Sequence, residues 1–171
     1  MKAETSLSHL FISSTRRKLI KVFFYTPNDI FYVRQLVRLI EEEINSVRRE
    51  LHNLKTANLI KSERRGNRLY YWANQQSSLF PQLLTLANKI SGLGLALSSP
   101  KNVESGVKML AYSHNFAINK SNNSDEVDLI IVGRISPQKI EKYIKQEEEI
   151  RNCEINYMVM GTTLQAVVNV I

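Results

Sequence analysis

Polar and basic side chains gather on one side of a helical pattern between residues 44 and 56. Apolar residues recur there at i, i+3, i+7 and i+10, which predicts one buried stripe: Ile44, Val47, Leu51 and Leu54. The opposite side then carries hydrogen-bonding and positively charged groups: Asn45, Ser46, Arg48, Arg49, His52, Asn53 and Thr56. In the major groove of DNA, arginine pairs with guanine edges and asparagine with adenine edges, whereas serine and threonine more often hold phosphates. The segment therefore predicts a helix that contacts double-stranded DNA, with Glu50 at the edge of its exposed face.

A second basic cluster follows at residues 64–68, between two short β-prone runs. The runs at 60–63 and 69–72 predict strands, and the Gly-Asn pair between them is typical of a β-hairpin. An arginine-rich hairpin tip can reach a minor groove or the DNA backbone, and this tip would carry Arg64, Arg65 and Arg68. The alternative interpretation is a basic helical bundle whose exposed arginines are only solvated.

The elements that would position these residues follow the order of a winged helix-turn-helix. Helical periodicity predicts four helices, at 14–25, 33–40, 44–56 and 78–91. Ser14 is the expected N-cap of the first helix, Pro81 lies in the first turn of the fourth, and Gly92 and Gly94 would end it. The fourth helix has more apolar residues than one buried stripe needs. Its surplus predicts either a dimer surface or packing against the rest of the chain.

Four segments of this half resemble one family. They are FYVRQLVR (31–38), INSVRREL (44–51), NLIKSERRGNRLYY (58–71) and LFP (79–81). Together they resemble prokaryotic winged-helix transcriptional regulators of the arsenic-repressor-like type, over roughly residues 8–95. The resemblance implies a DNA-binding regulator that is commonly a homodimer and is often fused to a small nucleotidyltransferase-like domain.

The pattern becomes α/β in the C-terminal part of the chain. Strands are predicted at 107–112, 127–132 and 154–160, with a polar loop at 113–124 and a charged helix at 137–151. The apolar residues of that helix would face inward: Ile140, Tyr143, Ile144 and Ile150. Strand, helix and strand at this spacing predict a parallel crossover over a small sheet.

The three strand segments resemble a polymerase-beta-like minimal nucleotidyltransferase in layout: VKMLAY (107–112), SDEVDLIIVG (124–133) and EINYMVM (154–160). The expected fold class is thus α+β, with an N-terminal winged helix-turn-helix over 1–95 and a linker over 96–104. A degenerate nucleotidyltransferase-like α/β domain would span 105–171.

The functional positions of that second domain depart from the family pattern. Such an enzyme needs a Gly-Ser turn for the phosphates and converging carboxylates for a pair of Mg²⁺ ions. Ser113-His114-Asn115 stands at the turn, the acid pair would be Glu126 and Asp128 beside Asp125, and Asn156 replaces the third acid. We therefore expect no catalytic residues, no metal and no cofactor. Mg²⁺ at Glu126 and Asp128 would follow only if the domain is active.

Two other functions remain open at this point. One is a nucleotidyltransferase of the toxin–antitoxin type that modifies a protein or a small molecule. The other is an adaptor whose basic half binds RNA, which would favour exposed aromatics among Tyr70, Tyr71 and Trp72. His114 and Cys153 are each isolated, and residues of these types in such settings are more often structural than catalytic.

The two parts of the chain differ in their balance of basic and acidic residues. Of 171 residues, 23 are Lys or Arg and 16 are Asp or Glu, a formal net charge of +7. Residues 1–95 hold 15 basic and 7 acidic side chains, whereas residues 96–171 hold 8 and 9. This asymmetry favours a polyanionic partner for the first part only, and a small-molecule or protein effector would act at the second.

Composition limits the cellular compartments in which the protein is expected. A single cysteine excludes an intramolecular disulfide, and no apolar run approaches the length of a membrane span. The N-terminal charges follow the first apolar residues, which is the reverse of a signal peptide. We expect a cytoplasmic protein without a membrane partner.

Overall fold

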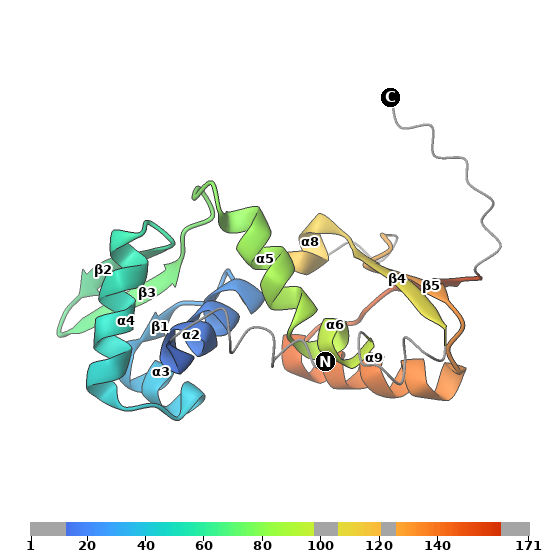
Figure 1. Cartoon of the computed structure of the whole chain (residues 1–171), viewed down its shortest axis with the longest axis horizontal. Helices are drawn as coiled ribbons and strands as arrows, with labels where there is room; N and C mark the ends of the chain where they lie inside the picture. The colour runs from blue at the N-terminus through green and yellow to red at the C-terminus, as the bar shows by residue number, and fades with distance from the viewer. Residues whose placement is uncertain (1–12, 98–105, 121–125, 162–171) are drawn as a thin grey trace.

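The computed structural model describes residues 13–97, 106–120 and 126–161. Over these residues the fold is mixed α+β, with seven helices and two three-stranded sheets. Figure 1 shows an N-terminal half and a C-terminal half side by side, with helix α5 between them. Each half has its own cluster of buried apolar side chains.

The N-terminal half consists of helices packed against a small antiparallel sheet. Its elements are α2 (Ser14–Tyr25), β1 (Phe31–Tyr32), α3 (Val33–Ile40), α4 (Ile44–Thr56), β2 (Ile60–Arg65) and β3 (Arg68–Ala73). The sheet order is β1-β3-β2, with both pairings antiparallel. The predicted bounds of α3 and α4 are confirmed, and Val47, Leu51 and Leu54 of the expected α4 stripe are buried.

Three local details of this half differ from the prediction. Ser13, not Ser14, caps α2, because its hydroxyl accepts a hydrogen bond from the Arg16 amide at 3.2 Å. The hairpin strands reach Arg65 and Arg68, which leaves a two-residue turn in which Gly66 has a φ of 59°. Strand β1 was not predicted, because two residues are too few to show a period and only pairing with β3 defines them.

Helix α5 (Phe80–Lys89) is shorter than predicted, and α6 (Gly92–Leu97) follows it. The prediction that Gly92 ends a helix is wrong, because Gly92 begins α6 with a φ of 47°. A Cβ atom at Gly92 would collide with the side chains of Tyr25 and Glu147, so glycine suits both the positive φ and the space at this turn. Part of the apolar surplus of the predicted helix packs within the chain, whereas Leu79, just before α5, is 53% exposed. Phe80 and Leu84 join the N-terminal core, and the Phe80 and Phe24 rings lie 5.9 Å apart.

The C-terminal half is a three-stranded sheet with one long helix. Its elements are β4 (Val107–Tyr112), α8 (His114–Ala117), β5 (Leu129–Gly133), α9 (Pro137–Arg151) and β6 (Tyr157–Met160). The sheet order is β4-β5-β6, and β6 runs parallel to β5 across α9, as the strand–helix–strand pattern predicts. The predicted polar loop contains the short helix α8, which begins where the Ser113 hydroxyl accepts from the Phe116 amide at 3.1 Å.

The bounds of α9 are as predicted, but one of its inward positions is wrong. Ile140 and Ile144 are buried, whereas Ile150 is 59% exposed. Glu147 and Arg151 continue the buried stripe instead. Hydropathy periodicity does not predict burial of charged residues, and these two are buried together because they form an ion pair and hydrogen bonds with other elements.

Among the helices of the described ranges, none has the length and apolar character needed to cross a bilayer.

Candidate nucleic-acid interface

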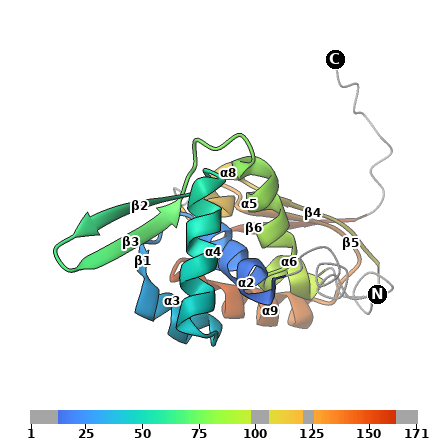
Figure 2. The same ribbon diagram turned by 60° about the vertical axis from the view of Figure 1, so that its left-hand side comes forward.

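Helix α4 presents the expected polar face to solvent. The buried stripe of α4 turns its opposite side outward, so that Asn45, Arg48, Arg49 and His52 are exposed and Ser46 is half-buried. Figure 2 shows the β2–β3 hairpin projecting beside α4 and away from the C-terminal sheet. One straight, rod-like partner could therefore touch both elements.

The two acids at α4, the N-cap Glu43 and Glu50 inside the helix, are both engaged within the chain. The Glu43 carboxylate caps the helix by accepting from the amides of Asn45 and Ser46. Glu50 is 3% exposed and accepts from Arg16 Nε at 2.7 Å, so the expectation that it lies at the edge of the exposed face is wrong. Burial acts to raise the pKa of Glu50, but hydrogen bonds from Arg16, Ser13 and Asn53 outweigh it and the pKa is lowered. Glu50 thus stays ionised beside Arg16 and leaves the outer face without an acid.

Four arginines surround one cavity beside α4. The cavity has a volume of about 730 Å³ and lies between α3, α4 and the hairpin. Its walls include four guanidinium groups that we call the arginine groove: Arg34, Arg38, Arg48 and Arg68. The other described residues in its walls are Tyr32, Val33, Asn67, Leu69 and Tyr71, and none of them carries a carboxylate.

None of these four arginines forms an ion pair within the described residues. All four are exposed, and the Arg68 guanidinium lies 5.0 Å from the centre of the Tyr32 ring. Their positive charges therefore depend on solvent and its ions for compensation in the free protein. The groove is a ready site for an anion with several negative groups.

Sequence reasoning placed Arg48 and Arg68 at the interface but missed Arg34 and Arg38. A signal existed, because Arg34 and Arg38 are four residues apart and share the face of α3 opposite Leu36 and Ile40. What the sequence did not reveal is that the start of α3 lies beside the hairpin turn. That juxtaposition comes from the pairing of β1 with β3.

The arginines at the hairpin tip differ in their contacts within the chain. Arg65 pairs with Glu63 at 2.8 Å and lies 5.8 Å from the centre of the Tyr70 ring. Both side chains of that ion pair are more than half exposed, so it adds little stability and an anion could displace it. Arg64 is exposed and donates a long hydrogen bond, 3.4 Å, to the Gly66 carbonyl.

The aromatic residues of β3 are not presented as a stacking platform. Tyr71 is buried, and Tyr70 and Trp72 are half-buried. The Tyr70 ring contacts Tyr32 edge to face at 6.2 Å. The RNA-binding alternative expects exposed aromatics, and this arrangement does not favour it.

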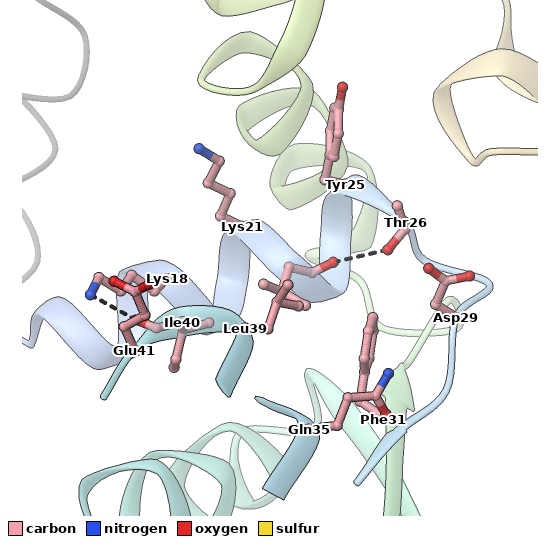
Figure 3. Close-up of a pocket in the computed structure, with 11 residues that line it drawn as sticks. Lys18, Lys21, Tyr25, Thr26, Asp29, Phe31, Gln35, Leu39, Ile40 and Glu41 are labelled. Carbon is pink, nitrogen blue, oxygen red and sulfur yellow. Dashed lines mark hydrogen bonds between the residues drawn. The ribbon is translucent and has the colours of Figure 1, made fainter. Parts of the chain in front are cut away.

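A second cavity of about 730 Å³ lies between α2 and α3 and has a different character (Figure 3). Its walls carry charges of both signs, from Lys18, Lys21, Asp29 and Glu41, around an apolar floor. The Lys18 ammonium is engaged within the chain, since it donates to the Ile40 carbonyl at 2.8 Å and pairs with Glu42. Of these two cavities, the arginine groove is therefore the one whose charged walls are all positive.

The structure places the candidate acids of the C-terminal half in different surroundings. Asp128 is 4% exposed, and its Oδ2 accepts from the Asn156 amide at 3.0 Å, which ties the entry of β6 to that of β5. Glu126 is exposed and contacts Asn115 at 3.5 Å, while Asp125 lies outside the described residues. Within the described ranges, no group of three or more His, Cys, Asp or Glu side chains is placed to hold a metal ion. Cys153 is half-buried, and burial raises the pKa of its thiol, which keeps it neutral.

Comparison of the chain with protein-family models, with curated proteins and with solved structures gave no match.

Proposed function

We propose that this protein binds double-stranded DNA as a winged-helix transcriptional regulator, with α4 in the major groove and the β2–β3 hairpin as the wing. The observation that carries the proposal is the arginine groove: four exposed arginines line one cavity, and no carboxylate from residues 13–97, 106–120 or 126–161 lies in its walls. Like charges held together in this way repel one another until an anion neutralises them. The regularly spaced phosphates of a nucleic acid duplex do so along its whole length.

The order of elements supports the same proposal. Helix, short strand, two helices and a hairpin, with sheet order β1-β3-β2, are the elements that the winged-helix proposal requires. A turn at Glu41 with a φ of 52° separates α3 from α4, as in a helix-turn-helix. The hairpin beside α4 then reaches a groove or backbone next to the one that α4 enters (Figure 2).

The roles of the residues follow from their positions. Asn45, Arg49 and His52 lie on the outward face of α4 and would contact base edges. The arginine groove, with Ser46, would hold phosphates, and Arg64 and Arg65 would contact DNA from the wing. We propose a homodimer, because two copies of so short a helix read two half-sites of a palindrome.

The C-terminal half has no catalytic role in this proposal. Asp128, the buried member of the candidate pair of metal ligands, already accepts from the Asn156 amide. We propose that this half holds an effector or a partner, and that the whole protein works in the cytoplasm without a metal or cofactor.

The proposal is tested by removing the groove's charge. In one variant Arg34, Arg38, Arg48 and Arg68 become Gln. The matched control makes the same change of charge in the exposed residues of the C-terminal half: Arg134, Lys139, Lys142 and Lys145. Fluorescence anisotropy on a duplex of random sequence, from about 50 to 200 mM salt, measures affinity. We expect the groove variant to lose at least about 100-fold at low salt and its salt slope to fall by about 3 to 4, with the control within about threefold of the natural protein.

Two results would contradict the proposal. Equal losses in both variants would mean that net charge alone attracts DNA. Unchanged affinity in a groove variant that still unfolds cooperatively would remove the groove from the interface.

A further inference from the structure

A cavity of about 440 Å³ lies where α5 meets the C-terminal half. We call it the seam cavity. Leu84 of α5, a member of the N-terminal core, forms one wall, and Leu110 and Tyr112 of β4, which pack on the C-terminal core, form another. Cavities of this size at the junction of two packed units are where proteins most often bind small molecules.

The polar groups of the seam cavity offer hydrogen-bond donors. Lys89 is exposed and has no ion-pair partner in the part of the chain that the structure describes. Tyr112 is protonated at neutral pH as any tyrosine is, and burial raises its pKa further. Among the residues that the structure describes, no carboxylate lines the cavity. An occupant would complement these walls with an apolar body and one negatively charged head.

The seam cavity also touches the hydrogen bonds that join the two halves. Asn88 lines the cavity, and its Oδ1 accepts from Arg151 Nη2 at 3.0 Å. Arg151 pairs with Glu147, and the Glu147 carboxylate accepts from the Tyr25 hydroxyl of α2. A molecule in the cavity therefore lies one side chain away from a buried cluster that links α2, α5 and α9.

We propose that the seam cavity is a binding site for a small organic anion with an apolar body, in which Lys89 holds the anionic head and Leu84 and Leu110 contact the body. The site shares no lining residue with the arginine groove, so it can be tested without DNA.

Two fluorescent probes of nearly the same shape test the site. Anilinonaphthalene sulfonate carries a negative charge, and phenylnaphthylamine is its neutral counterpart. Titration of the full chain should give saturable binding of both, with the anion bound more tightly. Lys89→Gln should weaken the anion about fivefold and leave the neutral probe unchanged. Thr85→Trp plugs the cavity from an exposed position, so it should weaken both probes at least about tenfold without disturbing either core.

The matched control is Lys21→Gln, which removes a lysine from the walls of the cavity between α2 and α3 (Figure 3). We expect it to change neither probe. If Lys21→Gln weakens the anion and Lys89→Gln does not, the site lies between α2 and α3 and the proposal is overturned. Identical binding in all three variants, or no saturable binding to the natural chain, overturns it as well.

Discussion

Arginine is used in opposite ways in the two halves of the molecule. In the C-terminal half, the Arg151 side chain is 1% exposed and every side of it is engaged. Nε donates to Glu147 at 2.6 Å, Nη1 to the Phe116 carbonyl at 2.8 Å and Nη2 to Asn88 at 3.0 Å. The guanidinium also lies over the rings of Tyr25 and Phe116, 4.7 and 4.3 Å from their centres. The arginines of the groove are exposed and, within the described residues, form no ion pair.

The difference between these arginines is whether their hydrogen-bond donors are used within the chain or remain available to a partner. A charge taken out of water must be paired and hydrogen-bonded, so Arg151 and Glu147 act on the fold and have nothing left to offer a partner. A charged side chain that stays in water has no desolvation free energy to offset, and its N–H donors remain available. Four such charges at one cavity add little to stability, and the proposed function assigns them to DNA.

Removal of the buried charge should have the largest effect. Arg151→Met leaves the Glu147 carboxylate buried without its cation, and we expect a loss of about 3 to 5 kcal/mol in the free energy of unfolding. Urea denaturation followed by circular dichroism measures it. The double variant with Glu147→Met should recover part of the loss, because no unpaired charge remains. A loss below about 1 kcal/mol in the single variant would show that Glu147 finds another partner.

Single arginines of the interface should have smaller effects, on binding and not on stability. Arg49→Ala should cost about 1 to 3 kcal/mol at a specific DNA site and little on random DNA, if Arg49 contacts a base. Arg68→Ala should weaken both DNAs alike and lower the salt slope by about 1. Anisotropy on a selected site and on its scrambled version compares them. Equal losses on both DNAs for Arg49→Ala would reassign Arg49 to the backbone.

The smallest expected effect concerns an ion pair of the N-terminal half. A hydrogen bond from Lys18, at 2.8 Å, lowers the pKa of Glu42 against a small cost of burial, with help from the Thr15 and Ser14 hydroxyls. A lowered folded-state pKa stabilises the fold above the unfolded-state pKa, and that stability is lost as the pH falls through the folded-state pKa. Glu42→Gln should therefore lower the urea midpoint at about pH 6 but not at about pH 3. The exposed Glu149→Gln is the control, and a Glu42→Gln effect that persists at the lower pH would contradict the ionic explanation.

The fold was predicted best where its causes are local. Helices 33–40, 44–56 and 137–151 have the expected bounds, because apolar spacing and turn residues act within one or two turns of the chain. The exposed side of α4 follows from the same period, so the sequence alone places Asn45, Arg48, Arg49 and His52 at a surface. The charge asymmetry between the halves is likewise a property of the sequence.

Tertiary structure decided what those residues meet. Arg34 lies beside Arg68 in one cavity although 34 positions separate them, because the sheet order β1-β3-β2 brings the start of α3 to the hairpin. Glu147 and Arg151 appear in the sequence as solvated charges and are buried, because Tyr25, Asn88 and Phe116 supply their partners from other elements. Local periodicity shows which way a side chain points from its own helix. It does not show which distant segment will be there, and for a charged group that neighbour determines whether the charge holds the fold together or remains free to bind.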